Sequence, residues 1–198
     1  MAIGLLIVAL LAVGPFLWAV GAYHRLLGLR VGFRTAFGQI DALLKRRYEL
    51  IPSLVEVARS HMQQERETLE AVIAARNSAA SARQAAAINP AVSAAITQMT
   101  HAEGALTSAL ARMFALVEAY PALKADPGMS RLIDELTALD ARVAFARQAF
   151  NDAVLDYNSA IGQFPASLVA RLFKFRTAEP LAAVDAALAP KPPMVTFS

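Results

Sequence analysis

The chain has 198 residues and no cysteine, which excludes disulfide scaffolds, thiol nucleophiles and cysteine-ligated metal centres. Hydrophobic residues make up 57% of the chain and the mean hydropathy is +0.43, a value typical of proteins with a membrane segment. Residues 24–52 hold six basic and two acidic groups, a net charge of +4, whereas residues 53–198 hold thirteen and fourteen, a net charge of −1. Such confined basic charge argues against nucleic-acid binding and favours contact with anionic lipid headgroups.

The first predicted element is a transmembrane helix. Residues 1–23 carry no charged side chain and are long enough, as a helix, to cross the roughly 30 Å hydrocarbon core of a bilayer. Trp18 and Tyr23 stand near the end of this stretch, where aromatic side chains favour the membrane interface. A cleaved signal peptide would need basic residues ahead of the apolar run, and the sequence has none there. We therefore expect an uncleaved anchor.

The orientation of the anchor follows from the basic residues beside it. Arg25, Arg30 and Arg34 follow the apolar stretch before the first acidic residue, and no basic residue precedes it. The positive-inside rule then places the N-terminus outside and the following domain in the cytoplasm.

The anchor continues into a predicted helix that reaches about Tyr48. Pro52 removes a backbone donor, and Ser53 and Glu56 form a capping-box pattern for a second helix directly after it. Pro52 either ends the first helix, which leaves four helices in the chain, or only kinks it, which leaves three. The more even helix lengths favour four.

The remaining helices are separated by proline-containing breaks. The second runs to about Ala87, the third from Pro90 to Tyr120, and the fourth from Asp126 to Gly162. The fourth has a coiled-coil-like apolar seam with alternating steps of three and four: Met129, Leu132, Leu136, Leu139, Val143, Ala146, Phe150, Ala153 and Tyr157. Long helices joined by short loops predict an all-α fold in which residues 24–162 form an antiparallel, up-and-down four-helix bundle.

Residues 163–198 form the predicted tail. Four helices of alternating direction return Gly162 to the anchored end, so we expect residues 163–176 to lie beside the membrane. This segment combines apolar residues with Arg171, Lys174 and Arg176, a composition suited to the lipid interface. The alternative is that its apolar side chains cap the end of the bundle. The last residues are rich in proline and alanine, and we expect them to be loose.

Polar residues at apolar positions need a separate explanation. Glu65 and Arg76 fall on the apolar stripe of the second predicted helix, where a charge is costly unless it is paired. We interpret them as ion pairs or register devices rather than as a binding site. Asn151 and Asn158 are seven residues apart and share one helix face, which favours buried amides that set register over ligands for a substrate.

The densest basic cluster comprises Lys45, Arg46 and Arg47, followed by Tyr48. It is interpreted as a solvated face or a complement to the dipole at the end of a helix. The functional alternative is a binding site for a partner or a phosphate group.

Three motifs resemble the LemA family. Two are long, QIDALLKRRYELIPSLVEVARSHMQQERETLEAVIAARN and ARQAFNDAVLDYNSAIGQFP, and a shorter one, YHRLLGLR, directly follows the anchor. The resemblance covers essentially the whole chain. It implies a bacterial protein with one N-terminal transmembrane helix and a helical bundle, and it implies no reaction.

Signatures of catalysis are absent from the sequence. It has no Glu-x-x-His pair, P-loop, GxGxxG, GxSxG or HExxH motif. We therefore expect no catalytic, cofactor-binding or metal site. The favoured function is a scaffold of the bacterial inner membrane that forms homo-oligomers and organises or curves the lipid beneath them. One alternative is an adaptor that docks on another membrane protein, such as a protease or signalling complex. The other is an enzyme or small-ligand protein with an unrecognised pocket.

Overall fold

The computed structural model describes the backbone of residues 2–182 and the side chains of residues 13–182. The described chain contains helices and no strands, which confirms the predicted all-α class. The elements are α1 (Ala2–His61), the 3-10 turn η1 (Gln63–Glu65), α2 (Arg66–Ile88), α3 (Ser93–Ala119), α4 (Pro121–Lys124), α5 (Pro127–Gly162) and α6 (Ala166–Leu172). The predicted loose tail after residue 182 lies outside the described residues.

The first helix is much longer than the sequence predicted. α1 continues through Pro15 and Pro52 and ends only at His61, so the expected break at Pro52 is wrong. Ser53 and Glu56 lie inside α1 and do not start a new helix. The chain reverses instead at Met62 and η1, before α2 begins.

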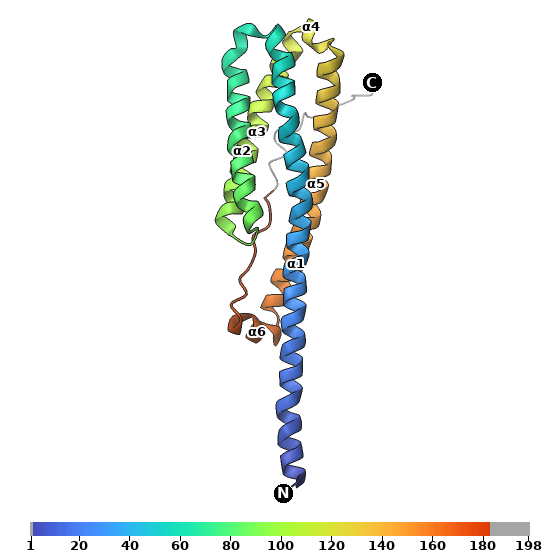
Figure 1. Cartoon of the computed structure of the whole chain (residues 1–198), viewed down its shortest axis with the longest axis vertical. Helices are drawn as coiled ribbons and strands as arrows, with labels where there is room; N and C mark the ends of the chain where they lie inside the picture. Colours follow the sequence, from blue (N-terminus) through green and yellow to red (C-terminus); the bar gives the residue numbers. More distant parts are fainter. Residues whose placement is uncertain (1, 183–198) are drawn as a thin grey trace, which may run out of the picture.

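The four long helices run side by side with alternating direction (Figure 1). α1 packs most extensively against α5 and also against α2, and α2 packs against α3. No such packing joins the described backbones of α3 and α5. The predicted four-helix bundle is therefore not confirmed. Three pairs of neighbouring helices pack together, and the fourth pair, α3 and α5, leaves an open side.

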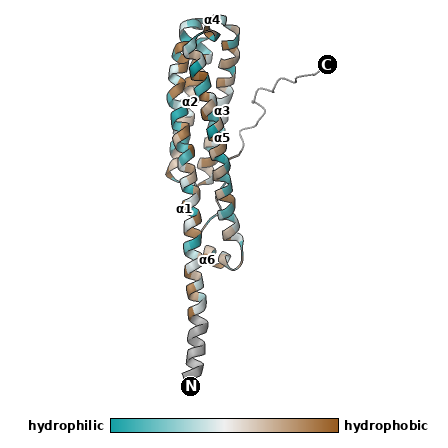
Figure 2. Ribbon diagram, turned by 90° about the vertical axis from the view of Figure 1, so that its right-hand side faces the viewer, coloured by the Kyte–Doolittle hydropathy of each residue, from teal (hydrophilic) through white to brown (hydrophobic). Residues whose placement is uncertain are grey.

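The predicted seam of α5 is confirmed as a buried stripe. Leu136, Val143 and Phe150 are all buried, and Phe150 is fully enclosed. Its ring packs edge-on against Phe33 and Phe37 of α1, with centroids 6.3 and 5.7 Å away. Figure 2 shows hydrophilic and hydrophobic residues interleaved along the helices, as expected where one face of each is buried.

The N-terminal part of α1 extends beyond the other helices (Figure 1). Residues 2–23 of the predicted transmembrane stretch are helical, and the last of them, up to Tyr23, lie beside α6. The side chains of residues 1–12 lie outside the described residues. Within the part of the chain that is described, no helix is both long and apolar enough to cross a membrane. The helix is confirmed, whereas its membrane-spanning role is not.

Candidate functional site

An aromatic cluster joins the C-terminal segment to α1. The ring of Tyr23 packs against Phe173 and Phe175, with centroid distances of 4.7 and 5.8 Å. Val169 and Ala170 of α6 are buried. The segment after Gly162 thus returns to the N-terminal part of α1, as the alternating helix directions predicted, and part of it packs on that end of the molecule.

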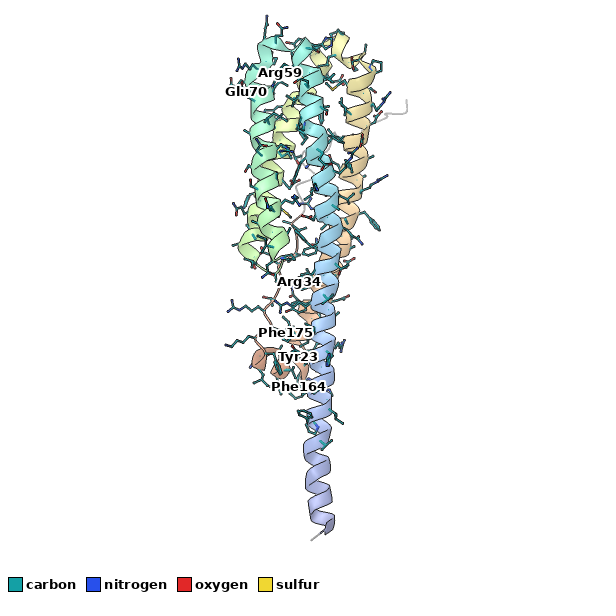
Figure 3. The ribbon with its side chains drawn as sticks, viewed as in Figure 1. Tyr23, Arg34, Arg59, Glu70, Phe164 and Phe175 are labelled. Carbon is teal, nitrogen blue, oxygen red and sulfur yellow. The ribbon has the colours of Figure 1, made fainter. Side chains whose placement is uncertain are left out.

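Other apolar side chains of this end remain exposed. Phe164, Leu168 and Leu172 are each more than half exposed, and Phe164 reaches 81%. On the neighbouring part of α1, Phe16 and Trp18 also face outward. Figure 3 shows Tyr23, Phe164 and Phe175 close to one another beside α6. We call this region, residues 13–25 together with residues 163–175, the aromatic end.

Basic residues surround the aromatic end. Arg25, Arg171 and Lys174 are exposed there, and Arg25 lines a hollow of about 360 Å³ together with Trp18 and Phe164. Arg30 lies further along α1 and is half-buried, and exposed Arg176 begins the segment that leaves this end. The structure therefore gathers the predicted interface residues around one end of the molecule, with Arg30 and Arg176 at its edge.

The two predicted asparagines hold an extended segment, residues 176–182, which we call the strap. The amide of Asn158 donates to the carbonyl oxygen of Ala178 at 2.8 Å and accepts from its N–H at 2.9 Å. Asn151 makes the same pair of bonds with Leu181, at 3.0 and 2.8 Å. Their role is thus to bind main chain, which the sequence interpretation missed.

Two further side chains of α5 extend this row of hydrogen bonds. The hydroxyl of Tyr157 donates to the carbonyl of Arg176 at 2.9 Å, and Arg147 donates to the carbonyl of Ala182 at 3.2 Å. Burial raises the pKa of Tyr157 and lowers that of Arg147. The strap is therefore bonded at both of its ends and at two points between them.

A buried charge cluster joins α1, α3 and α5. The predicted solvated face or helix end at residues 45–48 is wrong for Arg47 and Tyr48, because both are buried within α1, which continues to His61. Arg47 Nη1 lies 2.7 Å from Glu103 Oε2, and both side chains are almost fully buried. Arg47 Nε lies 2.8 Å from Asp140 Oδ1, and the hydroxyl of Tyr48 donates to Glu103. Burial, and then the charge of Glu103, raises the pKa of Tyr48. Burial also raises the pKa of Asp140, with Arg47 opposing the shift.

Glu103 was missed by the sequence analysis. It is an acidic residue among the apolar positions of α3, four residues after buried Met99 and three before buried Leu106. The same argument that singled out Glu65 and Arg76 would have found it.

The other predicted polar residues have separate roles. Arg46 is exposed and pairs with Glu135 at 2.9 Å. Glu65 lies in η1, not on a stripe of α2, and accepts from Tyr120 at 3.5 Å. Arg76 Nε donates to the carbonyl of Tyr48 at 3.0 Å. The expected ion pairs of Glu65 and Arg76 are wrong for the described side chains, because both residues make hydrogen bonds to uncharged groups instead.

The described residues contain no group of three or more histidine, aspartate or glutamate side chains placed to hold a metal ion. Arg47 and Glu103 at the centre of the charge cluster are 4% and 5% exposed, whereas Asp140 at its edge is exposed. The arrangement of the cluster suits the joining of three helices better than the binding of a ligand.

The chain is similar to a known protein family and to several magnetosome proteins. A model of the LemA family matches residues 36–197. The chain is also 31% identical over 78 residues to the magnetosome protein MamQ of Magnetospirillum gryphiswaldense, and to magnetosome proteins MamQ 1 and MamQ 2 of Paramagnetospirillum magneticum. The match covers 39% of this chain and 29% of each relative. The matched stretch thus spans less than a third of the curated relatives.

Proposed function

The chain belongs to the LemA family, and from this membership we propose that it is a membrane-anchored scaffold protein that assembles with copies of itself. In this proposal the uncharged residues 1–23 anchor the chain in the bacterial cytoplasmic membrane. The helices beyond the anchor form the LemA-like bundle in the cytoplasm, because Arg25, Arg30 and Arg34 follow the apolar stretch.

The aromatic end is the observation that carries the proposal. Exposed Phe164, Leu168 and Leu172 lie beside the part of α1 that leads into the apolar N-terminal stretch. Basic residues at the rim of an apolar surface suit anionic headgroups, where each charge contributes about 1 kcal/mol. The anchor and α6 would thus contact the same leaflet of the bilayer.

The charge cluster and two glycines of α1 support the scaffold role. The buried pair of Arg47 and Glu103 joins α1 to α3, and Arg47 also pairs with Asp140 of α5, so we propose a structural rather than an enzymatic function. Gly14 and Gly21 lie on α1, and a Cβ at either position would meet nothing within 4 Å. Small residues of this kind let neighbouring helices approach closely in lipid. Anchors lying side by side would hold several copies together and could bend the membrane beneath them.

Trp18 provides a direct test, because it is the only tryptophan of the chain. Full-length protein is reconstituted into vesicles whose lipids carry a quencher either just below the headgroup or deep in the acyl chain. We expect the shallow quencher to reduce Trp18 fluorescence more strongly than the deep one. Fluorescence unchanged by both quenchers would contradict the membrane role.

A charge-reversal experiment tests the contribution of α6 and the segment after it. The variant Arg171→Glu, Lys174→Glu, Arg176→Glu should lose the preference for anionic over neutral vesicles. A matched variant reverses three exposed charges elsewhere: Lys124→Glu, Arg131→Glu and Arg142→Glu. It should keep that preference. Equal behaviour of the two variants would mean that the basic residues near α6 do not face lipid.

Protease added to intact spheroplasts tests the orientation, and it should spare the helical domain. Affinity capture of the full-length protein separates the scaffold from the adaptor alternative. A second protein recovered in fixed stoichiometry would favour the adaptor.

A further inference from the structure

The open side between α3 and α5 is occupied by the strap. Two side chains of the strap, Ala178 and Leu181, are buried at 4% and 2% exposure. The hydroxyl of Thr97 on α3 lies 3.5 Å from a carboxylate oxygen of Glu179, while α5 supplies the asparagine bonds. The strap thus contacts both helices along the side that they do not close themselves.

The spacing of Asn151 and Asn158 along α5 matches the spacing of their two partners along the extended strap. Asn151 and Asn158 are seven residues apart, which is about 10.5 Å along an α-helix. Ala178 and Leu181 are three residues apart, which is about 10 Å along an extended chain. Each amide therefore meets a main-chain N–H and carbonyl of the strap in turn. Pro180, between the two contact points, fixes its own φ and keeps this stretch from becoming helical.

Recognition of the strap depends mainly on its main chain. All six hydrogen bonds from α5 reach N–H or carbonyl groups of the strap. Side-chain selectivity comes from the small buried Ala178 and the aliphatic buried Leu181. The site therefore fits an extended polypeptide in which a small residue is followed three positions later by an aliphatic one.

The strap is connected to the aromatic end by exposed residues. Phe173 and Phe175 pack on Tyr23, whereas Arg176 and Thr177 are exposed before the buried Ala178. The backbone at Thr177 is therefore the point where the strap would turn toward a neighbouring molecule while the aromatic contacts stay in place.

We propose that the surface formed by Asn151, Asn158 and Arg147 of α5 and Thr97 of α3 is a polypeptide-binding site, and that in the assembled protein it takes residues 177–182 of the strap of a second copy. This proposal rests on the proposed membrane-anchored assembly. Copies anchored in one membrane stand at the same height, so the strap of one is level with the site of its neighbour. Exchange preserves the hydrogen bonds to Ala178, Leu181 and Ala182, whereas the Arg176 carbonyl, next to Phe175, stays on Tyr157 of its own chain. The close spacing of anchored copies supplies the high effective concentration that binding between chains requires.

Cross-linking of the full-length protein tests the exchange, because the natural chain has no cysteine. Thr97→Cys is placed in one tagged copy and Glu179→Cys in an untagged copy, and the two are assembled together with a short bismaleimide. We expect cross-linked heterodimers. In the assembled protein a double variant carrying both cysteines should cross-link between chains, and cross-linking confined to one chain, without any heterodimer, would overturn the exchange.

Two controls connect the cross-link to the site. Asn151→Ala with Asn158→Ala should reduce heterodimers about tenfold or more, since it removes four hydrogen bonds. Gln148→Ala with Asp152→Ala, exposed neighbours on the same helix, should leave them unchanged. Unaltered cross-linking in the asparagine variant would overturn the proposal.

A competition experiment does not depend on the folding of a variant. Excess peptide RTAEPLA, which has the sequence of residues 176–182, should suppress the heterodimer, and a scrambled peptide should not. Equal effects of the two peptides would count against a selective site. A multi-subunit mass without heterodimers would overturn the exchange alone, whereas unquenched Trp18 would instead count against the membrane role.

Discussion

The Nε atom of Arg76 on α2 lies 3.0 Å from the main-chain carbonyl oxygen of Tyr48 on α1. In an uninterrupted α-helix this carbonyl would accept from the N–H of residue 52, and Pro52 has none. Arg76 thus supplies the donor that the proline withholds. This contact explains how α1 continues past Pro52, and it ties α2 to α1 at that point.

The first prediction concerns this contact. Arg76→Ala leaves a partly buried carbonyl without its donor and should lower the free energy of unfolding by about 1–3 kcal/mol. In the Pro52→Ala background residue 52 again donates to Tyr48, so the same change should cost clearly less. Urea unfolding of the four proteins in this cycle measures the difference.

Arg112→Ala, which removes an exposed arginine from α3, is the control and should change stability little. Equal costs of Arg76→Ala in both backgrounds would show that Arg76 does not compensate for the proline.

The second prediction concerns the buried pair of Arg47 and Glu103. Glu103→Ala leaves the charge of Arg47 buried without its closest partner and should cost about 3–5 kcal/mol. Arg47→Met combined with Glu103→Leu removes both charges and should recover most of that loss. Chemical denaturation measures both effects.

Glu135→Ala breaks the exposed pair with Arg46 and should cost at most about 1 kcal/mol. If the double variant is no more stable than Glu103→Ala, the cost lies in lost packing and not in an unpaired charge.

The third prediction concerns the core of α5. Phe150 is fully buried against Phe33 and Phe37, so Phe150→Ala should cost about 3–5 kcal/mol. Phe145 lies on the same helix and is 79% exposed, so Phe145→Ala should change stability by less than about 0.5 kcal/mol. Similar thermal midpoints of the two variants would contradict the register of the helix.

The fourth prediction concerns alkaline pH. Burial and Glu103 raise the pKa of Tyr48 in the folded protein, whereas an unfolded tyrosine has a pKa of about 10. Above that pH the unfolded chain loses a proton that the folded chain keeps. The contribution of Tyr48 to stability is therefore complete below pH 10 and decreases as the pH rises, by about 1.4 kcal/mol per pH unit.

Tyr48→Phe lacks this group, so its unfolding free energy should fall less steeply between pH 10 and 11 than that of the natural protein. The comparison is between slopes, because the variant also loses its hydrogen bond to Glu103. Parallel slopes would mean that Tyr48 does not contribute to the alkaline loss of stability.

Much of the helical architecture could be predicted from the sequence because its signals are local. The apolar seam from Met129 to Tyr157 follows directly from residue spacing, and the turn around Asp126 is marked by neighbouring proline and glycine. Asp126 accepts a hydrogen bond from the N–H of Met129 at the start of α5, as expected for a capping residue.

The missed features all depend on contacts between distant segments. The effect of Pro52 is offset by Arg76, 24 residues further along the chain. The partners of Asn151 and Asn158 are main-chain atoms about 20–30 residues away, which no side-chain pattern reveals. Glu103 carried a usable signal, because an acidic residue at an apolar position requires a buried partner.

The mass of the full-length protein in mild detergent tests the central claim, that this LemA-family chain is a membrane-anchored scaffold built from copies of itself. Light scattering or mass photometry should give one uniform multi-subunit particle whose mass is the same in several detergents. A monomeric mass in every detergent and at every protein concentration would contradict the account.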